Sequence, residues 1–280
     1  MADRETMWTS EGPEEPLLGG DVTEGIVRVG DTVRRPRTSS SEAVRTVLDH
    51  LERAGFEGAP RFLGVDDRGR DVLSFVEGEV AGRPAPAWVA DTSHAVSVAR
   101  LLRDYHVAVS SLGVPLLFAG DRSVEPDGIP PAIQLSQELV GHRDVTLENV
   151  VFRDERAVAL IDFDLARRSA PIEDVCNMLQ WWAPWMPPED RPHALADVDP
   201  FERAAAMVDA YGLDSASRSM LVPAARNGAA RSWHLMRMRA DRDGGGWRRM
   251  WDEGVGDVIR RRQEWLRFNE DELQAAVAGR

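Results

Sequence analysis

Hydrophobic and polar positions alternate along the first part of the chain, as they do in half-buried strands. Ile26–Val29 and Thr32–Arg35 fit two strands joined by a tight turn at Gly30-Asp31. Arg61–Val65 and Asp71–Val76 fit two further strands around a second turn. These segments predict a small antiparallel sheet near the N-terminal end.

A helix is expected between the two strand pairs. Ser39 and Glu42 have the spacing of a capping box, and apolar residues from Val44 to Leu51 then recur at helical spacing. A longer apolar stripe from Ala95 to Val109 predicts a second, longer helix. After a short predicted hairpin at residues 150–163, the remaining chain has a mostly helical pattern.

The resulting prediction is an α+β fold in two lobes. Residues 1–16 are acidic and are expected to be a loose lead-in. Residues 17–78 are expected to form a sheet-rich lobe with one helix. Residues 79–280 are expected to form a larger, mostly helical lobe.

Composition narrows the class of protein. The 280 residues are 43% hydrophobic, which is typical of a globular chain, and the net charge of −13 disfavours nucleic-acid binding. The acidic balance can attract a cationic substrate or can simply keep the protein soluble. There is one cysteine, Cys176, and no run of about 20 apolar residues that would span a bilayer. We therefore expect a cytoplasmic protein with no membrane association, and nothing in the sequence implies a protein partner.

The segment Gly141–Ala166, GHRDVTLENVVFRDERAVALIDFDLA, contains the clearest chemical pattern. Its His142, Asp144 and Asn149 fit the kinase catalytic-loop pattern H-R-D-x-x-x-x-N. In such a loop the aspartate accepts the proton of the attacking hydroxyl, which makes Asp144 the candidate catalytic base. An isolated aspartate would more often be a turn or capping residue, so the argument depends on its neighbours.

Asn149 and Asp162 are the candidate metal ligands. A carboxylate and an amide oxygen held at the ends of short strands suit Mg²⁺, which leaves further positions open for phosphate oxygens. Asp164 can assist the metal, bind an amine of the substrate or be solvated, and these alternatives stay open. His142 is expected to brace the loop by hydrogen bonding.

Nucleotide-binding residues are expected in the N-terminal lobe. Arg34 lies on the return strand of the first hairpin, where kinases place the lysine that contacts the phosphates, and Arg35 competes for that role from the opposite strand face. All 34 basic residues are arginine, so no lysine is available. Thr23 can donate a hydroxyl to phosphate, and the backbone groups of Phe75 and Val76, where the lobes join, suit an adenine edge.

Together these motifs resemble the aminoglycoside phosphotransferase family, small-molecule kinases with a protein-kinase-like fold. Besides Gly141–Ala166, Leu73–Gly78 resembles the family's hinge, and Pro171–Asp174 resembles the step after its metal motif. The resemblance implies a two-lobed kinase-like fold, ATP or GTP as co-substrate with Mg²⁺, and Asp144, Asn149 and Asp162 in the roles given above. It also implies a small-molecule hydroxyl acceptor, which can be an aminoglycoside-like antibiotic or a sugar-like metabolite.

Two departures from the family pattern motivate a rival hypothesis. Arginine stands where the lysine is expected, and Glu42, its possible ion-pair partner, is equally well explained as a capping residue. The rival is a catalytically silent nucleotide-binding regulatory protein of the same fold. The presence of Asp144, Asn149 and Asp162 together favours the enzyme.

Overall fold

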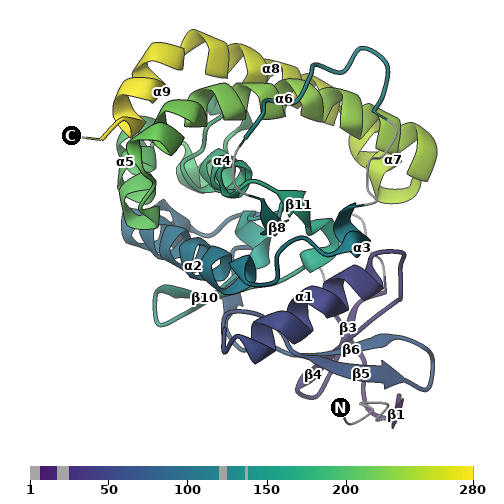
Figure 1. Cartoon of the computed structure of the whole chain (residues 1–280). Coiled ribbons are helices and arrows are strands. Elements are labelled where there is room, and N and C mark those ends of the chain that lie inside the picture. The colour runs from purple at the N-terminus through teal and green to yellow at the C-terminus, as the bar shows by residue number, and fades with distance from the viewer. Residues whose placement is uncertain (1–6, 18–24, 120–124, 136–137, 280) are drawn as a thin grey trace.

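The computed structural model describes residues 7–17, 25–119, 125–135 and 138–279. It has a sheet at the N-terminal end and a mostly helical remainder, with helix α1 (Ser41–Arg53) lying between the two (Figure 1). Within the described residues the sheet has six strands in the order β1-β5-β6-β4-β3-β2. These strands are β1 (Met7–Trp8), β2 (Glu15–Pro16), β3 (Val27–Val29), β4 (Thr32–Arg35), β5 (Phe62–Asp66) and β6 (Asp71–Ser74). The predicted α+β fold is confirmed.

The first hairpin forms as its alternating pattern predicts. Val27 pairs with Arg34 and Val29 pairs with Thr32, around the turn at Gly30 and Asp31. Gly30 has a φ of +58°, which glycine adopts at little cost. Because β4 is also paired with β6, it lies in the interior of the sheet, and both of its arginines are buried.

Helix α1 begins one residue later than the capping-box pattern predicts. Its N-cap is Ser40, whose side chain makes no capping hydrogen bond, while the Thr38 backbone N–H donates to Ser41 Oγ over 3.0 Å. Glu42 is exposed on the first turn of the helix. The predicted cap at Ser39 is therefore replaced by a turn closed by Ser41, although the apolar stripe of the helix is buried as expected.

The expected loose lead-in is corrected for the residues that the structure describes. Strand β1 pairs in parallel with β5, and the Trp8 indole N–H donates to the Leu63 carbonyl over 3.1 Å. Strand β2 pairs with β3, next to Glu14, whose carboxylate accepts from Arg68 and Arg70 at 2.9 Å each. Short edge strands of this kind depend on partners distant in the sequence, which local pattern does not reveal.

The chain passes from the sheet to the helical part through β7 (Glu79–Val80). This strand pairs with β9 (Val150–Arg153), which in turn pairs with β10 (Arg156–Leu160) as the predicted hairpin. Gly78 makes the passage possible, because its φ is +144° and a Cβ there would lie 2.4 Å from the Phe152 carbonyl oxygen. The linking segment is therefore clamped to the hairpin that carries Asn149 and Asp162 at its ends.

Helices build the rest of the molecule around one apolar core. Helix α2 (Thr92–Ser110) buries the predicted stripe, and α4 (Pro171–Trp182) packs with Trp182 fully buried. Strands β8 (Leu139–Gly141) and β11 (Arg167–Ser169) pair with each other beside α4 (Figure 1). The remaining helices are α3 (Leu116–Ala119), α4 (Pro171–Trp182), α5 (Pro200–Tyr211), α6 (Ser215–Asp243), α7 (Gly245–Asp252), α8 (Val255–Phe268) and α9 (Glu270–Val277). None of the helices in the described ranges has the length and apolar character needed to cross a membrane.

The clamp at Gly78 gives a stability prediction. Gly78→Ala should lower the free energy of unfolding by about 1–3 kcal/mol, because the added methyl meets the Phe152 carbonyl and the backbone is in a region that alanine avoids. Chemical denaturation of the purified protein measures this change. Gly82→Ala is the matched control, since a Cβ there has no atom within 4 Å. Equal stability of both variants would show that the clamp does not constrain the link.

Candidate active site

The catalytic loop runs from the end of β8 to the start of β9. The Asp144 backbone N–H donates to His142 Nδ1 over 3.3 Å, which turns the loop tightly. Asn149 then closes it, since its Nδ2 donates to the Asp144 carbonyl at 3.0 Å and to Asp144 Oδ2 at 2.8 Å. The structure therefore brings Asp144 and Asn149 into direct contact, as their five-residue spacing predicts.

Asp162 joins this pair through the neighbouring hairpin strand. The Ile161 N–H donates to the Asn149 carbonyl over 3.0 Å, and His142 Nε2 donates to the Ile161 carbonyl over 3.1 Å. Asp162 itself has a φ of +61°, which ends β10 and starts the short turn Phe163–Leu165. This left-handed backbone is strained for a residue other than glycine, and such strain is common where a functional side chain must be aimed.

His142 braces the loop and does not need a charge to do so. Its two ring nitrogens make opposite bonds: Nε2 donates to a carbonyl and Nδ1 accepts from an amide. This pattern requires the neutral ring with the proton on Nε2. Full burial lowers the pKa of His142, which agrees with a neutral ring near neutral pH. The bracing role predicted from the sequence is therefore seen in the geometry.

The two arginines of β4 point to opposite faces of the sheet. Arg34 is buried beside Asp66, with Nε 3.7 Å from Oδ2, and its guanidinium lies 5.4 Å from the Trp8 ring centroid. Arg35 points to the other face, where its Nη2 pairs with Asp164 and lies 3.5 Å from Asp162 Oδ1. The sequence analysis expected Arg34 to face the segment that contains Asp162. The structure corrects this expectation, because Arg35 faces that segment. A one-residue step along a strand reverses the face, and the sequence alone did not fix which face is which.

The remaining predicted nucleotide-binding residues have mixed outcomes. Phe75 and Val76 follow β6 at the passage between sheet and helices and are half-buried, and the Phe75 ring lies 3.7 Å from the Arg28 guanidinium carbon. The Phe75 backbone N–H already donates to the Asp31 carbonyl over 2.9 Å. Thr23 lies outside the described residues. Their predicted roles stay predictions.

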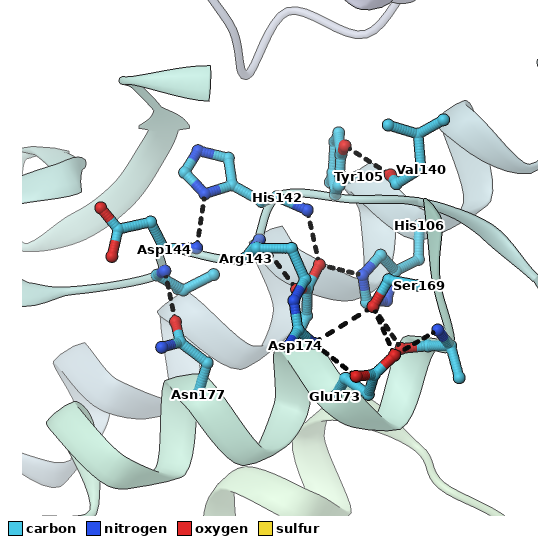
Figure 2. A network of polar contacts seen from close by, with 12 residues as sticks. Tyr105, His106, Val140, His142, Arg143, Asp144, Ser169, Glu173, Asp174 and Asn177 are labelled. Carbon is cyan, nitrogen blue, oxygen red and sulfur yellow. Dashed lines mark hydrogen bonds and ion pairs between the residues drawn. The ribbon is translucent and has the colours of Figure 1, made fainter. Parts of the chain in front are cut away.

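A buried carboxylate on α4 holds the loop in place (Figure 2). Asp174, fully buried on α4, accepts the backbone N–H groups of His142 at 2.7 Å and Arg143 at 2.9 Å. His106 contributes a third contact at 3.1 Å, and Tyr211 lies 2.6 Å from the other nitrogen of that ring. Arg143 has a φ of +68°, so the two amides of this tight bend point at the same carboxylate.

The charge state of Asp174 follows from these partners. Burial alone would raise its pKa, but the hydrogen bond and charge of His106, with Arg143 nearby, hold the pKa of Asp174 at about 2. Asn177, three residues further along α4, also holds the loop backbone, because its Oδ1 accepts the Val145 N–H over 2.6 Å. One turn of α4 thus fixes the backbone on both sides of Asp144 (Figure 2).

The donor set suits a hard divalent cation that is completed by phosphate oxygens. The Asn149 amide NH₂ is used on Asp144, which leaves the amide oxygen for a metal, and the Asp162 carboxylate is 32% exposed. No group of three His, Cys, Asp or Glu side chains gathers into a metal site in the described part of the chain. Mg²⁺ is commonly held by only one or two protein ligands plus phosphates, so these residues fit it.

A sequence comparison finds a family match over the segment that contains these residues. Residues 124–207, which include the catalytic loop and Asp162, match the family described as the phosphotransferase enzyme family. A curated relative, a trifolitoxin immunity protein of Rhizobium leguminosarum bv. trifolii, is 34% identical over 152 residues. That match spans about half of each protein, 54% of this chain and 54% of the relative.

Solved structures with the same fold cover nearly the whole chain. A choline/ethanolamine kinase family protein from Mesorhizobium loti has a TM-score of 0.57 at 18% identity, over 95% of this chain and 92% of that one. The gentamicin complex of APH(2")-IIa has a TM-score of 0.58 at 14% identity, over 91% and 93%. The chain has the fold of these kinases, and its residues 124–207 match the phosphotransferase enzyme family. The resemblance and the kinase-like fold predicted from the sequence are confirmed.

The anchoring of this loop by Asp174 can be tested through stability. Asp174→Asn should lower the free energy of unfolding by about 3–5 kcal/mol near neutral pH, because two backbone donors and His106 lose a buried carboxylate. Chemical denaturation measures the loss, and Asp104→Asn, at an exposed surface pair, serves as the control.

The same variant has a predicted pH dependence. The folded-state pKa of Asp174 lies below its unfolded value, so the carboxylate stabilises the fold above about pH 4 and this contribution is lost as the pH falls toward 2. The stability difference between wild type and Asp174→Asn should therefore narrow in acid. A difference that stays constant down to about pH 3 would contradict the assignment.

Proposed function

We propose that the protein is a small-molecule kinase that transfers the γ-phosphoryl group of ATP or GTP to a hydroxyl group. The observation that carries the proposal is the placement of Asp144, Asn149 and Asp162 in one loop and one hairpin: the Asn149 amide donates to Asp144, and the N–H of Ile161, the residue before Asp162, donates to the Asn149 carbonyl. Phosphoryl transfer needs mainly positioning and charge stabilisation, and this arrangement supplies both.

Asp144 is the proposed catalytic base. The Asn149 amide holds one oxygen of its carboxylate at 2.8 Å, which fixes the orientation of the group toward an incoming hydroxyl. The base orients the acceptor hydroxyl and accepts its proton as the oxygen attacks the γ-phosphorus and the bond to the nucleoside diphosphate breaks. The anchors on α4 keep the loop backbone from moving during this step.

Asn149 and Asp162 are the proposed Mg²⁺ ligands, through one amide oxygen and one carboxylate. A Mg²⁺ ion held there would supply positive charge that offsets the negative charge developing on the phosphates during transfer. Asp164 is proposed to position Arg35, since the two side chains form an ion pair on the face of β4 that is turned toward Asp162. This pair keeps the guanidinium beside Asp162 before nucleotide arrives.

Arg35 is the proposed phosphate-binding residue of the N-terminal lobe. It is the arginine of β4 that faces the catalytic segment, and a guanidinium can bind two phosphate oxygens at once. The backbone of Phe75 and Val76 is proposed to contact the base, because these residues lie where the sheet passes into the helical part. Thr23 is proposed to donate a hydrogen bond from its hydroxyl group to a phosphate oxygen of the nucleotide.

The acceptor is proposed to be an alcohol of an antibiotic-like or sugar-like small molecule. Proteins of the same fold include the gentamicin complex named above and the amicoumacin kinase hAmiN, solved with AMP-PNP and Ca²⁺, with a TM-score of 0.58 at 12% identity over 91% of this chain and 88% of that one. The curated relative is named for immunity to a toxin, which adds a protective role as a candidate context.

We propose a cytoplasmic location. Cys176 is consistent with a structural thiol, since burial raises its pKa to about 12.

The rival function is nucleotide binding without catalysis. It is favoured by arginine in place of the lysine and by the exposed position of Glu42, which faces solvent on α1. The intact contact between Asp144 and Asn149 opposes it, because a binding protein has no need of an oriented base. Transfer activity separates the two hypotheses.

The test is a screen of hydroxylated acceptors with purified protein, Mg²⁺ and either ATP or GTP. We expect one or more acceptors to gain the mass of a phosphoryl group. Asp144→Asn should lower the transfer rate by about 10²–10⁴-fold while nucleotide affinity stays within a few-fold. Nucleotide binding without transfer to any acceptor would favour the silent protein, and unchanged turnover in Asp144→Asn would rule out this base.

The two arginines of β4 form a matched pair for a second test. Arg35→Gln should weaken binding of Mg²⁺-nucleotide by about ten-fold or more, because a phosphate loses a charged hydrogen-bond donor. Arg34→Gln should leave nucleotide affinity nearly unchanged and should instead destabilise the sheet around Asp66. Calorimetric titration with a non-hydrolysable nucleotide measures affinity. A larger loss of affinity in Arg34→Gln would contradict the assigned strand face.

A further inference from the structure

Arg167 lies next to the catalytic loop and has no role in the site described above. It opens β11 and is paired with Gly141, the residue just before His142. Paired strand residues have Cα atoms about 5 Å apart, and three residues of extended chain span at most about 11 Å. The Cα of Arg167 is therefore within about 16 Å of the Cα of Asp144, the length of a modest small molecule.

The side chain of Arg167 is on the inner face of its strand. Alternate residues share a face, so Arg167 goes with Ser169, which is buried and accepts from Arg143 Nη1 over 3.2 Å. Arg168, between them, is exposed and pairs with Glu138 across the strand pair. Arg167 is half-buried on the side of the catalytic loop, whereas its neighbour is on the solvent side.

The carboxylates nearest to Arg167 are already used by other groups. Asp174 accepts from the backbone of His142 and Arg143 and contacts His106. Glu173 lies 3.3 Å from Arg143 Nη1 and accepts from Ser169 Oγ and the Ala170 N–H at 2.9 Å each. The side chain of Arg167 makes no hydrogen bond or ion pair with any residue in the ranges that the structure describes.

Two other arginines also act on Arg167 electrostatically. Burial, together with the charges of Arg143 and Arg239, lowers the pKa of Arg167 to about 9, against the opposing effect of Glu173 and Asp174. Arg239 comes from α6, and its guanidinium carbon lies 4.5 Å from the Trp247 ring centroid. A half-buried guanidinium without a carboxylate partner is costly, and an anion would relieve that cost.

We propose that Arg167, in the positive field that Arg143 and Arg239 reinforce, binds an anionic group of the phosphoryl acceptor, a carboxylate or a phosphate. The acceptor hydroxyl then lies at Asp144 while its anionic group is held at the start of β11. This inference rests on the proposed kinase function and specifies its substrate class. It reverses the expectation of a cationic acceptor, which came from a net charge of −13 averaged over the whole surface.

The first test measures anion binding without catalysis. Inorganic phosphate is titrated at constant ionic strength into Arg35→Gln, a background that removes the phosphate-binding arginine proposed on β4. We expect the thermal midpoint to rise with phosphate, and we expect this dependence to be lost when Arg167→Gln is added. Arg168→Gln in the same background is the matched control and should keep the dependence, since Arg168 pairs on the solvent side.

Two outcomes of this titration would overturn the proposal. One is a phosphate dependence that survives Arg167→Gln, and the other is no dependence in the parent variant. If Arg167→Gln is poorly folded by circular dichroism, Arg167→Lys decides the matter. This variant restores the charge without the planar fork, so a weakened but measurable phosphate dependence is expected.

The second test compares acceptors that differ only in charge. Suitable pairs are glycerate with glycerol, gluconate with glucose, and N-acetylserine with N-acetylserinamide, each supplied with Mg²⁺ and ATP. For a pair that is phosphorylated, kcat/KM should favour the anionic member by about ten-fold or more in wild type and in Arg168→Gln. Arg167→Gln should remove this preference.

The outcomes separate this inference from the function on which it rests. Equal or faster transfer to neutral members overturns the anionic acceptor and leaves the kinase function standing. Phosphate binding that depends on Arg167, with no transfer to any member of the pairs or of the acceptor screen, overturns the kinase function and the acceptor role with it. Preference for the anionic member that is unchanged in Arg167→Gln assigns the preference to another residue and overturns the role of Arg167.

Discussion

The buried carboxylate of Asp174 is the interaction on which the geometry of the site depends. It accepts two consecutive backbone N–H groups at the bend before Asp144, and such a bend is stable only where those amides find an acceptor away from water. Asn177 fixes the backbone just after Asp144 from the same helix. Because α4 is packed into the core through Val175, Leu179 and Trp182, the position of the catalytic loop is set by hydrophobic packing at a distance from the reacting atoms.

The sheet-rich and helical parts meet through charge as well as through backbone pairing. Strand β7 adds to the hairpin of the helical part, and Arg35 reaches across to Asp162 and Asp164. The Arg35 guanidinium lies beside both aspartates before a nucleotide is present, and its positive charge reduces the repulsion between the two carboxylates. Arg34, one residue away, serves the interior of the sheet by pairing with Asp66. Two chemically identical neighbours thus have different uses because strand geometry separates their faces.

Net charge and local charge differ in this molecule. The chain carries −13 overall, but the inner face of β11 presents an arginine whose nearest carboxylates have other partners. Long-range steering follows the average surface, whereas recognition of a bound group follows the few charges that are desolvated beside it. The absence of lysine makes every such contact a guanidinium, with its planar, bidentate geometry.

Local sequence determined the elements and the catalytic motif. The β3–β4 hairpin, the buried stripe of α2 and the contact between Asp144 and Asn149 all follow from residues close together in the chain, where periodicity and spacing carry the information. Tertiary structure decided the rest: the edge strands at residues 7–8 and 15–16, the face of β4 that meets Asp162, the use of Asp174 as loop anchor and the lack of a partner for the Arg167 side chain among the described residues. Each of these features depends on residues that are far apart in the sequence, and local sequence patterns do not show which distant residues come into contact in the folded protein.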